Sequence, residues 1–589
     1  MQLILRYMRK YIKSITVGMG IKFLATMMTL LLPYLLEYLI DYIVPMGKLS
    51  RMFLWGILMV FSAYASWRLN VAANRNAVKN AHFVSYDIRK ALFEKTSNLS
   101  GTTFDAFGLP SLTSRMTSDS YNVQSCVQML QTLCVRAPIL MIGGIAVTMT
   151  MDRVLSGILC LMLPILIGVI VLVSYKGIPL YTKVQDRLDE VVRIMRENIT
   201  GIRVVKALSK TEYEKRRFHK GNEALMKQDV IASTVMAIPG PFMQTCLNIG
   251  LTLVVYVGAV RVNNGQMKPG VILAFLTYFN LIMQSVMALN RMFMMISKAS
   301  ASADRIDLVL AAKDDQKVLT LENAKKPEES FGEEEFIRFE HVNFTYNQAI
   351  EENNRDAFFG EKQEQCLYDI SFRIKRGESL GIIGPTGCGK TTIINLLMRF
   401  YDVEDGAVFV DGKDVRTYDK DELHRKFGVV FQNDVIFNDT LRNNIVFGRA
   451  VGDEQLQGAV QDAMAEEFVS NLRDGLDYMA EIKGANLSGG QKQRVLIARA
   501  LAANPEILIL DDSSSALDYR TDAALRKAIA AHHQNSTLIM VAQRISSVQG
   551  MTNILVMDNG RCIGYGNHEY LMENCDEYRE IYEAQMGGM

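Results

Sequence analysis

The stretch SLGIIGPTGCGKTT, residues 379–392, decides the fold of the second half of the chain. It starts as a short apolar strand, passes through a glycine-rich turn and continues as a helical pattern after Lys390. The turn matches G-x-x-x-x-G-K-[ST], a loop whose small residues let backbone N–H groups wrap phosphates at the start of a helix. Because the strand and the helix flank the loop in the required order, the sequence predicts a nucleotide-binding α/β domain.

The loop assigns a role to its polar residues. Lys390 is expected to reach the β- and γ-phosphates of ATP, and Thr391 is expected to bind Mg²⁺. Cys388 is interpreted as a small filler rather than a redox group. The residues expected to contact the nucleotide here are Gly384, Pro385, Thr386, Gly387, Cys388, Gly389, Lys390, Thr391 and Thr392.

Two further motifs follow the phosphate loop. ILILDD, residues 507–512, is an apolar strand that ends in acid, and Asp511 is expected to hold Mg²⁺ through its water shell. LSGGQKQR, residues 487–494, is a second glycine-rich helix start of the kind that binds anions. One phosphate loop is enough for one nucleotide, so the second helix start predicts that the nucleotide is shared between two domains.

Short β-rich runs alternate with helical patterns around these motifs, which predicts a largely parallel sheet. The runs are 379–383, 408–410, 428–431, 507–510, 537–541 and 554–557. The polar, acidic stretch 311–335 is interpreted as a linker. Residues 336–589 are therefore expected to form the nucleotide-binding domain.

The first half, residues 1–310, is a different kind of sequence. Hydrophobic residues are 49% of the chain, and in this half they gather in stretches close to the ~20 residues that a bilayer-crossing helix needs. The six predicted spans are 15–44, 52–75, 127–150, 154–175, 234–260 and 271–296. The first is too long for a cleaved signal peptide. A buried helical core is the alternative, but six such stretches favour a membrane domain.

The basic residues of the loops predict how the chain lies in the membrane. Lys and Arg concentrate at the N-terminus and in 176–233, whereas the connections 45–51, 150–153 and 261–270 hold few. By the positive-inside rule, both termini and the nucleotide-binding domain face the cytosol, which places the chain in the cell (inner) membrane. The long segments 76–126 and 176–233 have heptad-like apolar spacing and are expected to continue the spans as helices.

Overall composition excludes other classes of protein. Lys and Arg number 64 against 63 Asp and Glu, so the net charge of +1 lacks the basic excess of a nucleic-acid-binding protein. The 8 cysteines are scattered without paired spacing. That pattern is typical of a reduced, cytosol-facing protein rather than a disulfide scaffold.

The motifs of the second half resemble one family closely. LSGGQ at 487–491 is similar to the signature of ABC-transporter ATPase domains, and SALD at 515–518 is similar to their D-loop. By this resemblance, Tyr346 in FEHVNFTYN stacks on adenine. Gln432 in VVFQNDVIF would sense both Mg²⁺ and the membrane domain.

The first half resembles the membrane domains of ABC exporter half-transporters. GIRVVKAL at 201–208, followed by Phe218, and ASADRIDLVL at 301–310 carry that likeness. The resemblance implies a type IV exporter fold, with a six-helix membrane domain followed by an α/β P-loop ATPase domain. It also implies an ATP-driven transport ATPase that moves amphiphilic drugs, lipids or peptides out of the cytosol.

In that family two chains enclose two ATP molecules. Each ATP lies between the phosphate loop of one chain and the signature of the other. The resemblance therefore implies that the signature contacts ATP held by a partner chain. The residues concerned are Ser488, Gly489, Gly490 and Gln491.

Two positions depart from the family pattern. The family usually has Glu after the acidic strand's Asp and His in the switch loop, whereas this chain has Asp512 and Gln543. The shorter carboxylate withdraws the general base by about 1 Å, and an error of that size can cost ~100-fold in rate. The two changes resemble the degenerate subunit of heterodimeric exporters. Asp512, Gln543 and Gln432 are therefore expected to form a weak catalytic site.

The implied partner is a homologous half-transporter with Glu and His at those two positions. A regulatory or channel-like half with little ATP turnover, and a homodimeric slow exporter, are the alternatives. A soluble ABC ATPase is excluded by the six predicted spans. An importer is disfavoured because importers usually keep the membrane and ATPase parts on separate chains.

Charged residues within the spans are candidates for function. The basic ones would favour an anionic or zwitterionic amphiphile if they line a cavity, although snorkelling would explain Lys22 and Arg68 equally well. The acidic ones near the outer end of span one would pair with basic residues or form part of an outer gate. The basic set is Lys22, Arg68, Arg136 and Arg291, and the acidic set is Glu37 and Asp41. The stretch 349–363 is interpreted as a surface loop.

Overall fold

The structure is a computed structural model that describes residues 1–586 apart from 313–315, 317, 321–324, 326, 328–331, 333, 347–364 and 514. The predicted surface loop at 349–363 and part of the predicted linker at 311–335 lie outside the described residues. The chain divides into two compact units. Unit one comprises Met1–Ser97 and Pro110–Ala311, and unit two comprises Asn98–Leu109 and Ala312–Met589.

Unit one is built from long helices. Among the residues that the structure describes, six helical segments are long and apolar enough to cross a membrane. These segments are Ile12–Met46, Leu49–Ser97, Leu109–Met151, Arg153–Thr200, Thr211–Asn263 and Pro269–Leu310. They confirm the six predicted spans. The helices α3 and α7 run for 49 and 48 residues, so each continues well beyond its predicted span.

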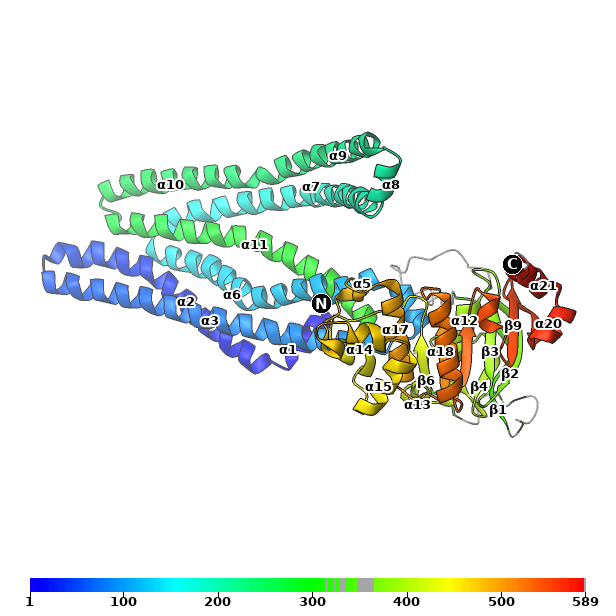
Figure 1. Cartoon of the computed structure of the whole chain (residues 1–589). Coiled ribbons are helices and arrows are strands. Elements are labelled where there is room, and N and C mark those ends of the chain that lie inside the picture. The colour runs from blue at the N-terminus through cyan, green and yellow to red at the C-terminus, as the bar shows by residue number, and fades with distance from the viewer. Residues whose placement is uncertain are drawn as a thin grey trace. The chain divides into compact units, whose positions relative to one another are not determined.

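The helices of unit one are α1 (Gln2–Arg9), α2 (Ile12–Tyr38), α3 (Leu49–Ser97), α5 (Leu109–Ser114), α6 (Ser120–Met151), α7 (Arg153–Thr200), α8 (Ile202–Ala207), α9 (Thr211–Ala237), α10 (Pro239–Asn263) and α11 (Pro269–Leu310). Short π- and 3-10 helices, η1 (Leu39–Ile43) and η2 (Val44–Met46), follow α2, and η3 (Arg115–Asp119) precedes α6. Figure 1 shows α7 running beside α9 and α10.

Local chemistry sets where these helices begin and break. Asp152 Oδ1 accepts hydrogen bonds from the N–H groups of Val154 and Leu155 at 2.9 and 3.0 Å, which caps the start of α7. Span five is divided at Ile238 into α9 and α10. Proline has no N–H to continue the helical ladder, and Pro239 instead occupies the first turn of α10.

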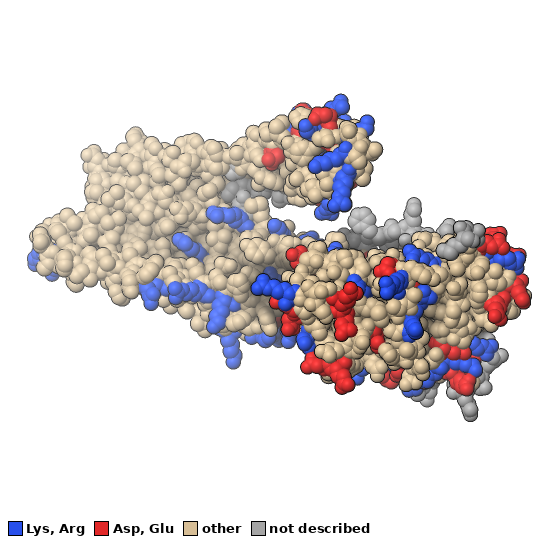
Figure 2. Space-filling view, viewed as in Figure 1, with Lys and Arg blue, Asp and Glu red and all other residues tan. Residues whose placement is uncertain are grey.

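The surface of unit one suits an apolar solvent. In Figure 2 almost no charged side chain covers α10, whereas α8 and the start of α9 carry charges of both signs. Large apolar side chains are exposed on its helices, for example Phe53 at 73%, Val60 at 70% and Leu161 at 67%. Water would disfavour so much exposed apolar surface, whereas lipid tails would not.

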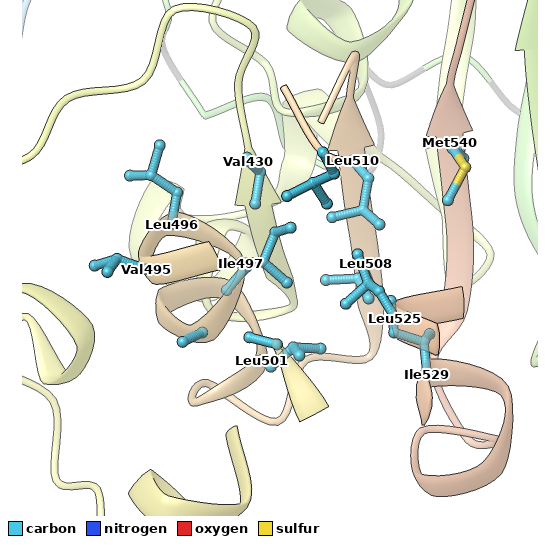
Figure 3. Packing of buried hydrophobic residues seen from close by; sticks show 14 of the residues in the cluster. Val430, Val495, Leu496, Ile497, Leu501, Leu508, Leu510, Leu525, Ile529 and Met540 are labelled. Atoms are coloured by element: carbon cyan, nitrogen blue, oxygen red, sulfur yellow. The ribbon is translucent and has the colours of Figure 1, made fainter. Parts of the chain in front are cut away.

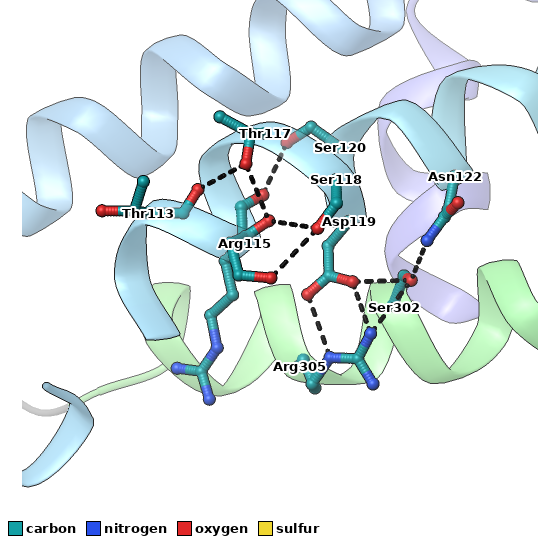
Figure 4. A network of polar contacts seen from close by, with 10 residues as sticks. Thr113, Arg115, Thr117, Ser118, Asp119, Ser120, Asn122, Ser302 and Arg305 are labelled. Carbon is teal, nitrogen blue, oxygen red and sulfur yellow. Dashed lines mark hydrogen bonds and ion pairs between the residues drawn. The ribbon is translucent and has the colours of Figure 1, made fainter. Parts of the chain in front are cut away.

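A buried polar network joins α11 to the start of α6 (Figure 4). The Asp119 carboxylate is buried and accepts hydrogen bonds from Ser302 Oγ at 2.8 Å and from Arg305 Nε at 2.9 Å. Arg305 Nη2 donates a second bond to the same carboxylate, which makes the pair bidentate. Asn122 Nδ2 donates to Ser302 Oγ at 3.0 Å. The network therefore fixes the register of α11 against α6.

Unit two contains two sheets. The six-stranded sheet has the order β10-β9-β3-β8-β7-β6, and its β9, β3, β8, β7 and β6 pair in parallel. The four-stranded sheet is antiparallel, with the order β2-β1-β4-β5. The strands are β1 (Glu335–Phe344), β2 (Leu367–Lys375), β3 (Ser379–Ile383), β4 (Asp405–Val410), β5 (Lys413–Asp414), β6 (Phe427–Val430), β7 (Ile507–Asp511), β8 (Thr537–Val541), β9 (Asn553–Asp558) and β10 (Arg561–Gly566).

The helices of unit two are α4 (Gly101–Phe107), α12 (Lys390–Leu397), α13 (Lys420–Arg425), α14 (Leu441–Val446), α15 (Asp453–Asp462), α16 (Glu466–Ser470), α17 (Gly489–Leu501), α18 (Tyr519–His532), α19 (Ile545–Val548), α20 (His568–Asn574) and α21 (Asp576–Met586). The predicted α/β domain with a largely parallel sheet is confirmed.

Alternate residues of β7 pack on opposite faces of the parallel sheet. Leu508 and Leu510 join a core with α17 and α18, as Figure 3 shows. Ile507 and Ile509 join a second core with α12 and the antiparallel sheet. A strand covered on both faces must be apolar at every position, which is why ILIL reads as a continuous apolar run. The first polar residues, Asp511 and Asp512, then fall at its carboxyl end.

Candidate nucleotide site

The phosphate loop joins β3 to α12 and is packed so closely that it requires glycine. Gly389, which precedes α12, has φ +99°, a left-handed conformation that side chains strongly disfavour. A Cβ at Gly389 would lie 2.6 Å from Leu367 Cδ2. A Cβ at Gly384 would lie 2.2 Å from the carbonyl oxygen of Met557. The backbone of the loop can therefore curve around a ligand only with glycine at positions 384 and 389.

The polar side chains of the loop lie at its mouth. Lys390 Nζ donates hydrogen bonds to the carbonyl oxygens of Gly384 at 2.9 Å and Pro385 at 2.7 Å. Thr391 Oγ1 donates to Asp511 Oδ2 at 2.9 Å, which joins the loop to the end of β7. Burial raises the pKa of Asp511, and the hydrogen bond from Thr391 opposes that rise.

A cavity of about 340 Å³ brings most of the predicted site residues together. Those that line it are Tyr346, Thr386, Gly387, Gly389, Lys390, Thr391, Thr392, Gln432, Asp511, Asp512 and Gln543. Gly384, Pro385 and Cys388 belong to the loop but do not line the cavity. Cys388 is buried, and burial raises the pKa of its thiol, which agrees with its interpretation as a filler.

Two lining residues were not predicted from the sequence. Cys366 precedes β2, and its Sγ lies 3.4 Å from Thr392 Oγ1. Val541 ends β8 beside Asp511, with which it is paired in register. Neither residue belongs to a motif, and only the strand pairing brings them to the site.

Tyr346 is held at the rim of the cavity by both ends of its side chain. Its hydroxyl lies 3.0 Å from Thr392 Oγ1 and accepts a hydrogen bond from Asn395 Nδ2 at 3.2 Å. Its ring packs edge-on against Tyr401, with centroids 5.1 Å apart. The aromatic face is therefore pre-positioned next to the phosphate loop.

Asp512 and Gln543 interact directly. Gln543 Nε2 donates a hydrogen bond to Asp512 Oδ2 at 2.9 Å. The backbone of Asp512 is left-handed, with φ +50°, and its N–H donates to the carbonyl oxygen of Val541 at 3.0 Å. Burial raises the pKa of Asp512, although hydrogen bonds from Gln543 and Gln432 oppose the rise. The two positions that depart from the family pattern thus form one unit.

The signature lies at the start of α17 and outside this cavity. Ser488 Oγ accepts a hydrogen bond from the Gln491 N–H at 3.3 Å, and Gln491 Oε1 accepts one from the Ser488 N–H at 2.8 Å. This capping box leaves the N–H groups of Gly489 and Gly490 without a hydrogen-bond acceptor in the described part of the chain. Ser488 and Gly489 are exposed. A single chain therefore carries the phosphate loop and the signature as two separate surfaces.

Comparisons with known proteins match a membrane region followed by an ATPase region. The model of the ABC transporter transmembrane region matches residues 15–286, and that of the ABC transporter matches residues 367–515. The uncharacterized ABC transporter ATP-binding protein YfiB of Bacillus subtilis is 32% identical over 540 residues, which span 92% of this chain and 90% of that protein. The chain belongs to the ABC transporter family.

Other relatives refine what this ABC transporter is similar to. The ATP-dependent lipid A-core flippase of Desulfotalea psychrophila is 32% identical over 502 residues, covering 85% of this chain and 84% of that one. A solved bacterial Atm1-family ABC exporter with ATP bound has the same fold, with a TM-score of 0.78 and 21% identity over 98% of this chain and 99% of that one. This chain is a multi-span ABC transport ATPase that has the fold of an ABC exporter.

Within unit two of the ABC transporter, α4 packs against the residues that follow α12. The Gly101 N–H donates a hydrogen bond to the carbonyl oxygen of Phe400 at 3.0 Å, and Tyr401 Oη donates to Asp105 Oδ2 at 2.5 Å. Tyr401 also packs against Tyr346. One tyrosine thus contacts both α4 and the rim of the nucleotide cavity.

Proposed function

We propose that this ABC exporter chain binds ATP and Mg²⁺ but has a degenerate ATP site, and that it works with a second half-transporter. The hydrogen bond between Gln543 and Asp512 carries the proposal. A general base needs a free carboxylate oxygen within reach of the attacking water. Here one carboxylate oxygen of Asp512, whose side chain is already short, accepts a hydrogen bond from the Gln543 amide. An amide neither takes up nor releases a proton near neutral pH.

The phosphate loop and the end of β7 fit ATP with Mg²⁺. The Thr391 hydroxyl and the Asp511 carboxylate are the hard oxygen ligands that Mg²⁺ prefers, and they lie 2.9 Å apart. When bound, Mg²⁺ neutralises charge on the β- and γ-phosphates. Lys390 supplies a further positive charge at the mouth of the loop, and the Tyr346 ring supplies a stacking face for the adenine.

The signature supports a two-chain site. Ser488 and the unpartnered N–H groups of Gly489 and Gly490 form an exposed anion-binding surface at the N-terminus of a 13-residue helix. They do not line the cavity of their own chain. A partner's phosphate loop that met this surface would complete a site containing the partner's own catalytic residues, which we infer to be Glu and His. The signature of this chain would then serve the efficient site.

An amphiphile with an anionic group is the substrate class that we propose. Arg136 and Arg291 line a cavity of about 280 Å³ between α6 and α11. Lys22 is buried at 3% exposure and donates only to Asn70 Oδ1 and Asn74 Oδ1, at 2.9 and 3.0 Å. None of these three cations has a carboxylate partner within the described ranges. Cations that lie buried or in a cavity between membrane helices suit an anionic head group joined to an apolar tail.

The distribution of basic residues supports the direction of transport. Segment 176–233 holds 13 Lys and Arg, whereas the short connection 45–51 holds two and 150–153 holds one. By the positive-inside rule, the ATPase and both termini face the cytosol. The likeness to an exporter fold then supports transport of the substrate out of the cytosol.

The test of the degenerate site is steady-state ATP hydrolysis by the purified chain in lipid nanodiscs. We expect ATP-Mg²⁺ binding with slow turnover, and loss of binding in Lys390→Ala. Fast turnover that Asp512→Ala abolishes would show an intact catalytic site and contradict the proposal. Binding and turnover that are equally absent would instead contradict the assignment of the nucleotide cavity.

A further inference from the structure

A second polar cavity lies in unit one, at the end where α2 meets η1, α6 meets α7 and α10 meets α11. Its volume is about 430 Å³. Three carboxylates line it, from Glu37, Asp41 and Asp152. Tyrosines from successive turns of the first span line it as well, namely Tyr34, Tyr38 and Tyr42. The nucleotide site does not use any of these residues.

The charges of the three carboxylates are not balanced. Asp152 forms an ion pair with Arg261 Nη2 at 3.0 Å and caps α7. Asp41 is 6% exposed, and its Oδ1 accepts a hydrogen bond from the Gly270 N–H at 2.6 Å. Asp41 Oδ2 is fully enclosed and has no hydrogen-bond partner among the residues that the structure describes.

Glu37 increases the imbalance. It is 9% exposed, lies four residues before Asp41 and forms no ion pair or hydrogen bond within the described part of the chain. Two buried carboxylates separated by one helical turn repel each other, and a buried charge is stable only when it is paired. The geometry therefore calls for a cation from outside the chain.

Among the described residues that line the cavity, Lys268 is the only basic one, and it forms no ion pair with Glu37 or Asp41. Its Nζ donates to the backbone carbonyl oxygen of Asp41 at 3.3 Å and lies 3.5 Å from the centroid of the Tyr42 ring. That position is a cation–π contact, so the Tyr42 face already accepts an ammonium group. Lys268 marks where a second ammonium group would compete.

The wall of the cavity favours an organic cation over a metal ion. Tyr38 stacks on Tyr42 with centroids 4.9 Å apart, and Trp55 stacks on Tyr38 at 4.7 Å. Aromatic faces attract ammonium groups, whereas Ca²⁺ needs six to eight oxygen ligands. No group of three or more His, Cys, Asp or Glu suited to a metal occurs among the described residues.

We propose that this cavity binds the ammonium group of an amphiphile. Glu37 and Asp41 supply the counter-charge, the Tyr42 ring supplies the platform, and Lys268 is the internal cation that the ligand displaces. The site is separate from the basic cavity at Arg136, because Arg136 and Thr150 lie roughly 20 Å apart along α6. The inference therefore does not depend on the anionic substrate class or on the ATP site.

The chain contains its own reporter for the test. It has two tryptophans, and Trp67→Phe leaves Trp55, which stacks on Tyr38 in the cavity wall, as the sole fluorophore. The full chain in phosphatidylglycerol nanodiscs is titrated with decyltrimethylammonium and, separately, with decyl sulfate. We expect a saturable change in Trp55 emission with the ammonium probe only. Equal saturable changes with both probes would overturn the proposal, because they would report the alkyl chain.

Charge variants test the roles of individual residues. Glu37→Gln with Asp41→Asn should weaken binding of the ammonium probe at least tenfold, while the matched control Glu190→Gln, an exposed carboxylate, should not. Asn at position 41 can still accept the Gly270 N–H, and the midpoint of thermal unfolding checks the fold. Lys268→Gln should tighten binding several-fold, a gain that a purely structural role would not produce. Unchanged affinity in both the Glu37→Gln/Asp41→Asn variant and Lys268→Gln would overturn the proposal.

Two further measurements identify which molecule occupies the cavity. Replacing part of the lipid by phosphatidylethanolamine should weaken the apparent affinity of the probe if lipid ammonium groups enter the cavity. Unchanged affinity would assign the site to free amphiphiles, and the ammonium chemistry holds in both cases. A response of Trp55 to millimolar Ca²⁺ with none to the ammonium probe would overturn the proposal in favour of a metal site.

Discussion

At the scale of single residues, the nucleotide cavity depends on positions where one atom decides the outcome. Motif spacing was enough to predict Lys390, Thr391 and Asp511, because a phosphate loop and an acidic strand end are recognisable without the fold. The hydrogen bond from Gln543 to Asp512 could not be predicted. It requires β7 and β8 to be neighbours and in register, with Asp511 opposite Val541, and sequence spacing carries no such information.

Restoring the two departures should speed hydrolysis. Asp512→Glu extends the carboxylate toward the attacking water, and Gln543→His replaces an amide donor by a ring that can carry positive charge. We expect the double variant of the purified chain to hydrolyse ATP up to ~100-fold faster than the unmodified chain. Steady-state phosphate release measures the rate, and Lys390→Ala in the same background is the control. An unchanged rate would mean that the defect lies elsewhere.

The phosphate loop should tolerate no side chain at Gly389. Gly389→Ala forces a Cβ to within 2.6 Å of Leu367 Cδ2 at a left-handed φ. Backbone strain of this kind costs about 1–3 kcal/mol, so ATP affinity should fall roughly 10–100-fold. Titration with a fluorescent ATP analogue measures it. Gly412→Ala is the matched control, since Gly412 has φ +74° and no neighbouring atom within 4 Å. Equal losses in both variants would point to general strain.

At the scale of elements, helices and strands were predicted where periodicity or length is strong. The six spans and the apolar run of β7 are examples, since both faces of a buried parallel strand must be apolar. The contact of α4 with Phe400 and Tyr401 could not be derived from sequence motifs or periodicity. Its partners come from a different part of the chain, and no pattern in either segment indicates the other.

Tyr401 should couple the nucleotide cavity to α4. Tyr401→Phe keeps the ring packed on Tyr346 but removes the hydrogen bond to Asp105. We expect ATP binding to be nearly unchanged and substrate stimulation of ATPase activity to fall. Titration of the ATPase rate with substrate separates the two effects. Tyr418→Phe, which removes a buried hydrogen bond to Val410 O at 2.9 Å, is the control and should leave stimulation intact.

The Asp119 network should hold α11 against α6. Arg305→Ala removes the bidentate partner of the buried Asp119 carboxylate, which keeps its hydrogen bond from the Ser302 hydroxyl at 2.8 Å. A buried acceptor that loses a partner costs about 1–3 kcal/mol. The midpoint of thermal unfolding in detergent should therefore fall. Arg305→Lys keeps the positive charge but loses the two-pronged guanidinium, so its unfolding midpoint should lie between those of the unmodified chain and Arg305→Ala. A Lys variant as unstable as the Ala variant would show that geometry matters more than charge.

At the scale of the whole molecule, the chain shows half of each ATP site that its family uses. The phosphate loop with Asp511 and Asp512 lines one cavity, and the signature presents its exposed helix start elsewhere. Sequence motifs predicted both halves. They could not identify the proposed partner, because one chain's sequence carries no information about the residues of another.

The proposed allocation of the two ATP sites can be tested by assembling this chain with the proposed partner half-transporter. Ser488→Arg would place a long side chain where the signature meets the partner's phosphate loop and would disturb the capping box with Gln491. Loss of a preorganised anion-binding surface costs on the order of 100-fold in rate. Because the proposed function assigns that surface to the efficient site, we expect the variant to remove most of the ATPase activity of the heterodimer.

Asp512→Ala in the same assembly should cost far less, because under the proposed function the Asp512 site contributes little turnover from the start. The comparison is steady-state ATP hydrolysis of the two variant heterodimers at equal protein and lipid, with the partner chain unmodified in both. Both variants leave Lys390 and Thr391 in place, so each should still bind ATP at this chain's own loop. If the Asp512 variant proves the more damaged, the efficient site is the one built on this chain's phosphate loop. The hydrogen bond from Gln543 would then have to position Asp512 for catalysis rather than weaken it.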